Sequence, residues 1–567
     1  MGFIKRRKNF ILLLLIISLA FVLRFYKLGE VPYGFYQDES AIGFNAYSIL
    51  ETGHDEYGKS FPLYFKSFGD YKLPIYIYST AIAVKVFGLN EFAVRFPSAL
   101  FGVLSVIALY LFTRELTKKS SIALVSSFLY SINPWSLHYN RATFEVSISL
   151  FLFLTGGYFL LKSFNKKNGL LFISGVVTFI TALYTYNLTR LLAPLLFLLF
   201  VLWFRKEVLS LGKKTLLTAL FVSVIMFFPF LSSFYREGGV GSATGTLIFT
   251  SAQVKAPQIE LRSYVLELSP LLSKIFFNSY ALSVIEFVKN VLRHLDFNFF
   301  FVSGSSHGNH GIGIVGQFYL FEAITMIMGL IYLAFKRKKW LLFLLSWIGI
   351  VIAAASLTRE APHATRSFFL IPSMLILSST GLIFIRNLLL NLKNKYIKYL
   401  LIISGLIFVL YNTVYYFSSY YLYFPAVYAK AWRSTDKDLS LYIKEVEKDY
   451  DRIIFDDKAG FIYSSLLFFY PYDPKSFQEE SVRLPDDSEG FSRIEKFGKY
   501  EFREVDWNED INLSERVLII SLPELIPEGV DVKKIFYYPK RHIVSAVGQK
   551  IIQYPVEEKS YVVVENQ

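Results

Sequence analysis

The sequence predicts an all-α polytopic membrane bundle followed by a soluble α/β domain. Three observations support this fold class: an apolar composition, a series of long apolar runs, and alternating clusters of basic residues. Hydrophobic residues make up 54% of the 567 residues and charged residues only 18%, whereas about a quarter of a soluble protein is charged. The net charge of +14 does not indicate a nucleic-acid partner, because the basic residues separate apolar runs instead of forming one basic face.

A spanning helix needs about 20 apolar residues, and eleven runs approach this length. The first, Phe10 to Leu23, follows four basic residues and has no small-residue cleavage site after it, so we expect a retained span and not a removed signal peptide. The other ten are 94–113, 121–137, 144–162, 169–187, 190–204, 215–235, 314–335, 340–357, 367–386 and 398–418. The runs 121–137 and 190–204 are the shortest.

The basic residues orient these runs. Short cytoplasmic loops are rich in Lys and Arg, and basic clusters precede the first run and follow every second one. They lie at 5–8, 114–119, 162–167, 205–214, 336–339 and 386–398. We therefore expect a multi-pass protein of the cell membrane with a cytoplasmic N-terminus. The first outer loop is then 24–93 and the second large one 236–313.

The C-terminal tail changes character. It is acidic, and it alternates an expected helix at 436–449 with expected strands at 452–455, 516–521 and 534–538. We predict a membrane domain over 1–419 and an extracytoplasmic α/β domain over 420–567. The chain contains no cysteine, which excludes disulfides and thiolate metal sites.

The first outer loop carries the strongest chemical pattern. Asp38 and Glu39 begin a predicted interfacial helix, and a second interfacial helix is expected from Pro74 to Phe87. A hydroxyl or amine that attacks a sugar carbon needs a base, for which Asp38 or Glu39 is suited. A departing phosphate needs cations, which Lys72 and Arg141 can supply. The simpler alternative is that the acidic pair only stabilises a helix N-terminus.

The motif Gln37-Asp38-Glu39, the helix after it and the segment Lys72-Leu73-Pro74 resemble the first outer loop of family 39-type glycosyltransferases. That family includes the protein O-mannosyltransferases and the lipid A aminoarabinose transferases. Further similar segments follow in order, and the resemblance covers roughly residues 20–390. These segments are 91–98, 134–135, 141–145, 184–190 and 311–321.

The resemblance implies a GT-C fold and a sugar donor carried on a polyprenyl or dolichyl phosphate. Transfer would occur outside the membrane with inversion at the anomeric carbon. It assigns the base to Asp38, a partner role to Glu39 and the donor phosphate to Lys72. Leu73 departs from the pattern, since relatives often carry proline there. The expected partners are the lipid-linked donor and membrane lipids, and the acceptor is left open among protein, lipid and cell-wall glycan.

Other candidates lie in the later outer loops. Arg141 and Arg366 are expected near donor phosphate, with Glu145 orienting Arg141. An ordinary helix-end ion pair for Arg141 and an interfacial anchor for Arg366 are the alternatives. The remaining candidates for substrate binding are Asp70, Tyr71, His307 and His310.

A metal site is not predicted. The histidines of the second outer loop match no standard zinc spacing, and an activated phosphate can leave without a metal, although a divalent cation is the alternative. Two other functions are compatible with a membrane protein of this kind. An oligosaccharyltransferase-like enzyme would move a preassembled glycan and use a divalent cation. A non-enzymatic lipid-linked sugar transporter or flippase would show inverted repeats and broken helices, and the sequence has neither.

Overall fold

The computed structural model describes residues 2–68, 70–236, 246–460, 462–485, 492–547 and 550–566. The chain forms two compact units. The first comprises Met1–Tyr26 and Ser98–Phe417, and the second comprises Lys27–Pro97 and Ser418–Gln567. The first outer loop therefore belongs to the same unit as the C-terminal tail.

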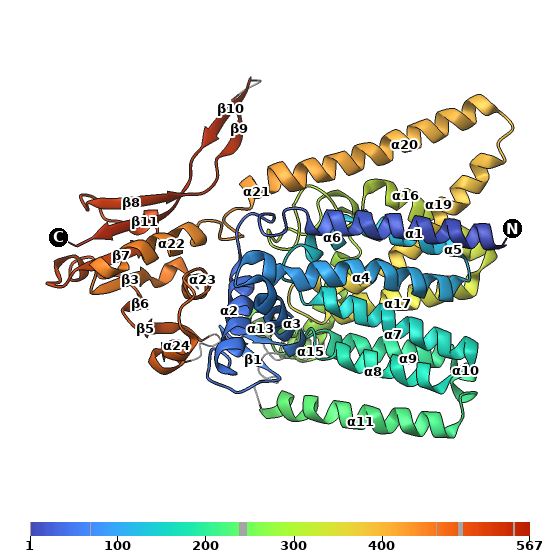
Figure 1. The fold of residues 1–567 in the computed structure, drawn as a ribbon, viewed down its shortest axis with the longest axis horizontal. Helices are drawn as coiled ribbons and strands as arrows, with labels where there is room; N and C mark the ends of the chain where they lie inside the picture. Colours follow the sequence, from blue (N-terminus) through green and yellow to red (C-terminus); the bar gives the residue numbers. More distant parts are fainter. Residues whose placement is uncertain are drawn as a thin grey trace. The chain divides into compact units, whose positions relative to one another are not determined.

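The first unit is a helical bundle whose long helices run side by side (Figure 1). Each apolar run predicted from the sequence contains one of the longer helices, which confirms the predicted fold class. These helices are α1 (Gly2–Phe25), α4 (Glu91–Thr117), α5 (Ser120–Ile132), α7 (Val146–Lys166), α8 (Gly169–Ala182), α9 (Thr189–Trp203), α11 (Lys213–Arg236), α16 (Leu320–Lys336), α17 (Lys338–Ser356), α19 (Ile371–Leu390) and α20 (Lys395–Ser418).

Shorter helices connect the long ones. They are α6 (Pro134–Asn140), α10 (Arg205–Leu209), α13 (Ala252–Leu268), α14 (Pro270–Phe276), α15 (Ser279–His294), η1 (Asn298–Val302), α18 (Ala364–Ser367) and η2 (Phe368–Leu370). Seven helices of the described residues are long and apolar enough to span a membrane, or eight if the bent pair of α14 with α15–η1 is one span. Among the eleven predicted runs, α5, α8, α9 and α16 are shorter than 18 residues.

The run 121–137 is not one helix. Its helix α5 stops at Ile132, and α6 starts at Pro134, because proline lacks the N–H and disfavours a helical residue before it. The side chain of Asn133 caps α6 by accepting a hydrogen bond from the Ser136 amide at 2.9 Å. The chain thus turns where the sequence analysis expected a continuous span.

A polar contact and a close backbone packing hold the bundle together at two places. Arg24 of α1 is fully buried and donates to Asn140 Oδ1 at 3.0 Å and to the Ser131 carbonyl at 3.1 Å. Elsewhere α16 and α19 pack backbone to backbone. A Cβ on Gly381 would lie 1.7 Å from the carbonyl oxygen of Thr325, so only glycine permits this approach, as is common between membrane helices.

The second unit is built on a seven-stranded mixed sheet of order β4-β5-β6-β3-β7-β11-β8. The strands are β3 (Arg452–Asp456), β4 (Val482–Arg483), β5 (Ile494–Phe497), β6 (Tyr500–Arg503), β7 (Val517–Ser521), β8 (Val532–Tyr537) and β11 (Lys559–Glu565). β3 runs parallel to β6 and β7, and the other pairs are antiparallel. A separate hairpin pairs β9 (Arg541–Val547) with β10 (Lys550–Val556).

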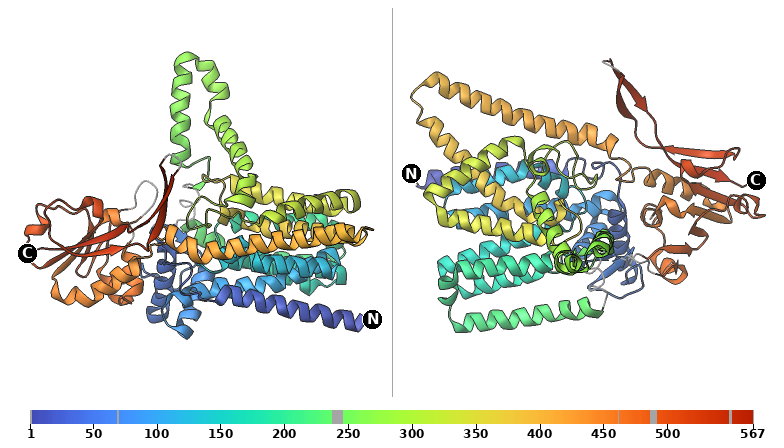
Figure 2. Two further views of the ribbon diagram at one scale, coloured as in Figure 1. Left: turned by 90° about the horizontal axis from the view of Figure 1, so that it is seen from above. Right: turned by 180° about the vertical axis from the view of Figure 1, so that it is seen from behind.

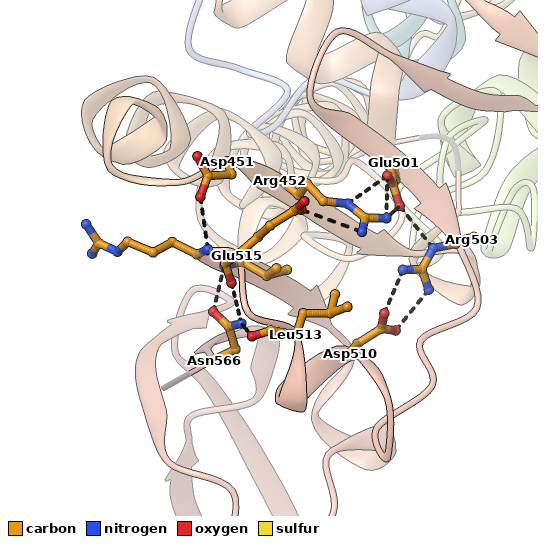
Figure 3. Close-up of polar contacts among 10 residues, drawn as sticks. Asp451, Arg452, Glu501, Arg503, Asp510, Leu513, Glu515 and Asn566 are labelled. Atoms are coloured by element: carbon orange, nitrogen blue, oxygen red, sulfur yellow. Dashed lines mark hydrogen bonds and ion pairs between the residues drawn. The ribbon is translucent and has the colours of Figure 1, made fainter.

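Ion pairs fix the ends of these strands (Figure 3). Arg503 of β6 donates to both oxygens of Asp510, at 2.9 and 2.7 Å. Arg452 of β3 donates to Glu501 at 2.7 Å. Bidentate pairs of this kind fix geometry as well as charge, so they hold β6 to β3 and to the segment at Asp510.

The helices of the second unit come from both ends of the sequence. The first outer loop supplies α2 (Gln37–Thr52), the hairpin β1 (Phe65–Ser67) and β2 (Asp70–Lys72), and α3 (Pro74–Phe87). The tail supplies η3 (Ser419–Tyr423), α21 (Phe424–Val427), α22 (Asp436–Val446), η4 (Glu447–Asp449), η5 (Asp457–Ala459), α23 (Ile462–Phe469), α24 (Pro474–Glu480), η6 (Asp510–Asn512) and η7 (Pro523–Leu525).

The predicted helix after Asp38 forms, but it is largely buried. Ala41 and Phe44 of α2 belong to the same apolar core as Leu466 of α23 and Leu518 of β7. Ser40 Oγ lies 2.9 Å from Ser464 Oγ. The sequence did not predict that the tail would cover this helix.

Candidate functional site

The strongest predicted base lies in the first turn of α2. Asp38 Oδ1 accepts a hydrogen bond from Lys72 Nζ at 2.8 Å. The Asp38 side chain keeps 39% of its surface exposed, whereas that of Lys72 keeps 4%. The β1–β2 hairpin positions the lysine by pairing Lys72 with Phe65. A reachable carboxylate is thus held by a buried cation.

Glu39, the neighbour of Asp38, faces the interior. Its two oxygens accept hydrogen bonds from Arg95 at 2.9 and 2.8 Å, and neither side chain is exposed. Arg95 also donates to three carbonyls of the segment before α2, those of Leu28, Pro32 and Gly34, at 3.2, 3.0 and 2.6 Å. The five N–H donors of the guanidinium therefore tie this segment to the first turn of α2. The segment 91–98 is part of the family resemblance, but nothing in the sequence indicated that Arg95 pairs with Glu39.

A further carboxyl lies beside Lys72. Glu56 is 1% exposed, and its Oε1 has no hydrogen-bond partner in the described part of the chain. Burial raises the pKa of Glu56 to about 7, against the opposing influence of the Arg483 and Lys72 cations. Arg483 donates to the Glu56 carbonyl at 2.7 Å and lies 3.6 Å from the centre of the Tyr57 ring. The tail thus contacts the segment next to the base.

The other candidates of the first loop lie in the same hairpin. Tyr71 stands in β2, and its ring centre lies 5.7 Å from that of Tyr64. The backbone of Asp70 pairs with Ser67, and its side chain lies outside the described part of the structure.

In the first unit, Arg141 ties α6 to the end of α1. The arginine is 1% exposed, and its Nη1 donates to the carbonyls of Leu23 and Arg24 at 2.8 and 3.2 Å. Glu145 stands at the N-cap of α7, in the next turn of the chain. Arg141 is the C-cap of α6 and Glu145 the N-cap of α7, so both residues lie at the junction of these two helices.

The first unit also gathers histidines and one arginine. The ring centre of His310 lies 5.4 Å from that of His307 and 4.7 Å from that of His363. Arg366 Nη1 donates to Thr358 Oγ1 at 2.9 Å, and its Nη2 lies 3.5 Å from Glu360 Oε2.

The buried histidines of this group are neutral. Burial lowers the pKa of His310 to about 3 and that of His363 well below its usual value, with Arg366 adding to both effects. Neutral rings can offer one N–H and one lone pair each, while Arg366 carries the positive charge. No three His, Asp or Glu side chains of the described residues are placed to share a metal ion.

Comparisons with known proteins agree with this fold. Residues 72–232 match the model of the family described as dolichyl-phosphate-mannose-protein mannosyltransferase. The segment includes Lys72, Arg95, Arg141 and Glu145. A comparison with curated proteins finds no match.

Several solved structures are similar. ArnT from Cupriavidus metallidurans in the apo state has 13% identity and a TM-score of 0.53, over 98% of this chain and 97% of that protein. The same enzyme bound to undecaprenyl phosphate has 12% identity and a TM-score of 0.53, over 98% of both chains. The Archaeoglobus fulgidus oligosaccharyltransferase has 14% identity and a TM-score of 0.48, over 83% of this chain and 64% of that one. This chain therefore spans about two thirds of that enzyme's length.

The chain is thus a multi-pass membrane protein with the GT-C fold, the fold of a superfamily of membrane glycosyltransferases. Within that class, its segment 72–232 is similar to the dolichyl-phosphate-mannose mannosyltransferases, and its fold is similar to that of ArnT over nearly the whole length. This likeness agrees with the resemblance drawn from the first outer loop.

Proposed function

We propose that this protein is a glycosyltransferase that moves a sugar from a polyprenyl-phosphate donor to an acceptor, with inversion. The Asp38–Lys72 ion pair carries the proposal, because it joins a reachable carboxylate in the first turn of α2 to a cation of β2. The family match supports it, since that family is described by a dolichyl-phosphate sugar. A lipid-bound state of ArnT, with undecaprenyl phosphate, gives further support.

In this mechanism Asp38 is the base. The acceptor hydroxyl or amine forms a bond to the anomeric carbon while its proton passes to the Asp38 carboxylate. The bond between that carbon and the phosphate oxygen breaks, and its electron pair leaves with the polyprenyl phosphate. Attack opposite the leaving group inverts the anomeric centre.

Lys72 links donor binding to the base. Its ammonium is held by Asp38 at 2.8 Å, and a donor phosphate would compete for the same cation. Donor binding would then draw Lys72 away and leave the carboxylate ready to accept a proton. Lys72 would finally stabilise the charge on the departing phosphate.

The surrounding residues take supporting roles in this proposal. Glu39 positions Asp38 through its pair with Arg95 and does not itself contact the acceptor. Arg141 and Arg366 bind the donor phosphate, with Glu145 orienting Arg141. The proposed contacts to the sugar or acceptor come from Asp70, Tyr71, His307 and His310.

The proposed topology follows the basic clusters of the sequence. The N-terminus is cytoplasmic, and transfer occurs at the opposite face of the cell membrane. Residues 1–419 form the membrane enzyme, and residues 420–567 form an outer domain that selects the acceptor.

The proposal is tested by transfer from a panel of radiolabelled polyprenyl-phosphate sugars to peptide, lipid and glycan acceptors in proteoliposomes. Asp38→Asn should lower kcat by about 10²–10⁴-fold, the usual contribution of a general base. Glu30→Gln is the matched control, because Glu30 is an exposed carboxylate of the same loop paired only at the surface with Lys27. Full activity of folded Asp38→Asn would remove Asp38 as the base.

Lys72→Ala separates donor binding from chemistry. We expect a raised KM for the donor and little change in the preference among acceptors, because in this proposal Lys72 binds the donor phosphate and makes no contact with the acceptor. An unchanged donor KM would contradict the role given to Lys72.

A further inference from the structure

The segment from α13 to α15, residues 252–295, forms an arm that leaves the bundle. Figure 2 shows α13 and α15 side by side, projecting across the direction of the spanning helices. The arm leaves at the end of the bundle away from the N-terminus (Figure 1).

Helix α15 buries polar side chains against the protein and exposes apolar ones, which is the opposite of a surface helix in water. Ser283, Asn290 and His294 are fully buried against the protein. The outward stripe is apolar, with side chains at four-residue spacing that are 50–80% exposed: Tyr280, Val284, Val288 and Leu292. A helix that packs its polar side inward and exposes its apolar side is solvated by something other than water.

α13 is exposed on all sides, and it presents charged residues such as Glu260 and Arg262 as well as apolar ones. None of the residues of α13 is buried, and its outward side chains include Ile259 and Leu268, which are 63% and 87% exposed. The bent pair of α14 with α15–η1 is long and apolar enough for a membrane span, although its two parts meet at 49°. The charged residues of α15 pair with one another, since Arg293 Nη1 lies 2.9 Å from Glu286 Oε1.

We propose that this arm lies within the membrane surface, with the stripe Tyr280–Leu292 in contact with phospholipid acyl chains. Helices with an apolar stripe and a charged opposite side lie in the bilayer interface in this way. The arm is continuous with the spanning bundle, which places its root at the edge of the bilayer. Lipid is therefore the occupant of the stripe.

The root of the arm also bears on the proposed donor site, and this step rests on the proposed function. Asn290 Nδ2 donates to the Thr358 carbonyl at 3.0 Å, and Thr358 Oγ1 accepts a hydrogen bond from Arg366 at 2.9 Å. An arm embedded at the surface sets Arg366 at the depth where a lipid-linked phosphate lies.

The chain contains no cysteine, so one introduced cysteine can be labelled uniquely. Val288→Cys and Leu292→Cys place an environment-sensitive fluorophore on the stripe. Lys289→Cys is the matched control, because Lys289 is 57% exposed and points to the charged side of the same helix. Each variant is reconstituted into phosphatidylcholine nanodiscs with plain or brominated acyl chains.

We expect brominated lipid to quench the label at Val288 and Leu292 more strongly than at Lys289, and aqueous iodide to quench in the opposite order. Iodide quenching at Val288 without bromolipid quenching would overturn the proposal, because the stripe would then face water. Protection from both quenchers, together with crosslinking of Val288→Cys between two copies, would also overturn it in favour of a dimer contact. Neither quenching measurement depends on activity, so the proposed function can fail while the membrane position of the arm is confirmed.

Discussion

Replacing Glu56 by glutamine should remove a pH-dependent loss of stability. The folded protein holds the proton of this carboxyl up to about pH 7, whereas the unperturbed pKa is 4.5. Between these two values the folded state binds more protons than the unfolded state. The free energy of unfolding therefore falls as pH rises through this window.

The size of the effect follows from the two pKa values. A change from 4.5 to about 7 corresponds to about 3 kcal/mol, most of it lost by pH 8. Ionised Glu56 is unfavourable because it is buried with Oε1 unpaired. Glutamine has nearly the same shape and no charge at any pH, so the variant should lose this component of the pH dependence.

The assay is thermal unfolding of the purified protein in detergent at pH 5 and pH 8, followed by intrinsic fluorescence. The decrease in Tm from pH 5 to pH 8 should be larger in the wild type than in Glu56→Gln. Glu51→Gln, which alters an exposed carboxylate of α2, should behave as the wild type. Equal decreases in the wild type and Glu56→Gln would refute the reasoning, because Glu56 would then be ionised in both folded and unfolded states.

Two further variants test the packing around α2. Arg95→Met leaves Glu39 buried without its pair and should lower the free energy of unfolding by about 3–5 kcal/mol. Chemical denaturation measures this change. An unchanged denaturation midpoint would contradict the structural role of the pair. Gly43→Ala would place a Cβ 2.4 Å from the Phe468 ring and 2.9 Å from Val94, and overpacking of this kind costs about 1–3 kcal/mol. Gly349→Ala is its control, since nothing lies within 4 Å of a Cβ there, and equal Tm values for the two variants would count against this packing.

Apolar length located the longer helices of the bundle, and the orientation indicated by the basic flanks stays a prediction. Both signals are local, because a span must satisfy its own backbone hydrogen bonds in lipid. Pro134 is a signal for a helix break at Asn133-Pro134. The apolar residues on both sides nevertheless favoured the prediction of one continuous span. Local patterns similarly predicted the strands β3 and β7 of the tail.

The candidate site was predictable only in part. The resemblance drew attention to Asp38 and Lys72, and the structure joins them in an ion pair. The partner Arg95 and the buried carboxyl of Glu56 were missed, because burial by a distant segment leaves no local signal. Glu56 lies in a polar stretch whose sequence is typical of an exposed loop. The residue that contacts it, Arg483, follows more than four hundred residues later.

The pairing of the first loop with the tail has a consequence for biosynthesis. Ser40 and Ser464, which meet across α2 and α23, are 424 positions apart. Translation at about 5–20 residues per second separates their emergence by roughly 20 to 80 s. During that interval α2 lacks the surface of the tail that covers it, so the segment that holds Asp38 completes its packing only after α23 has been synthesised.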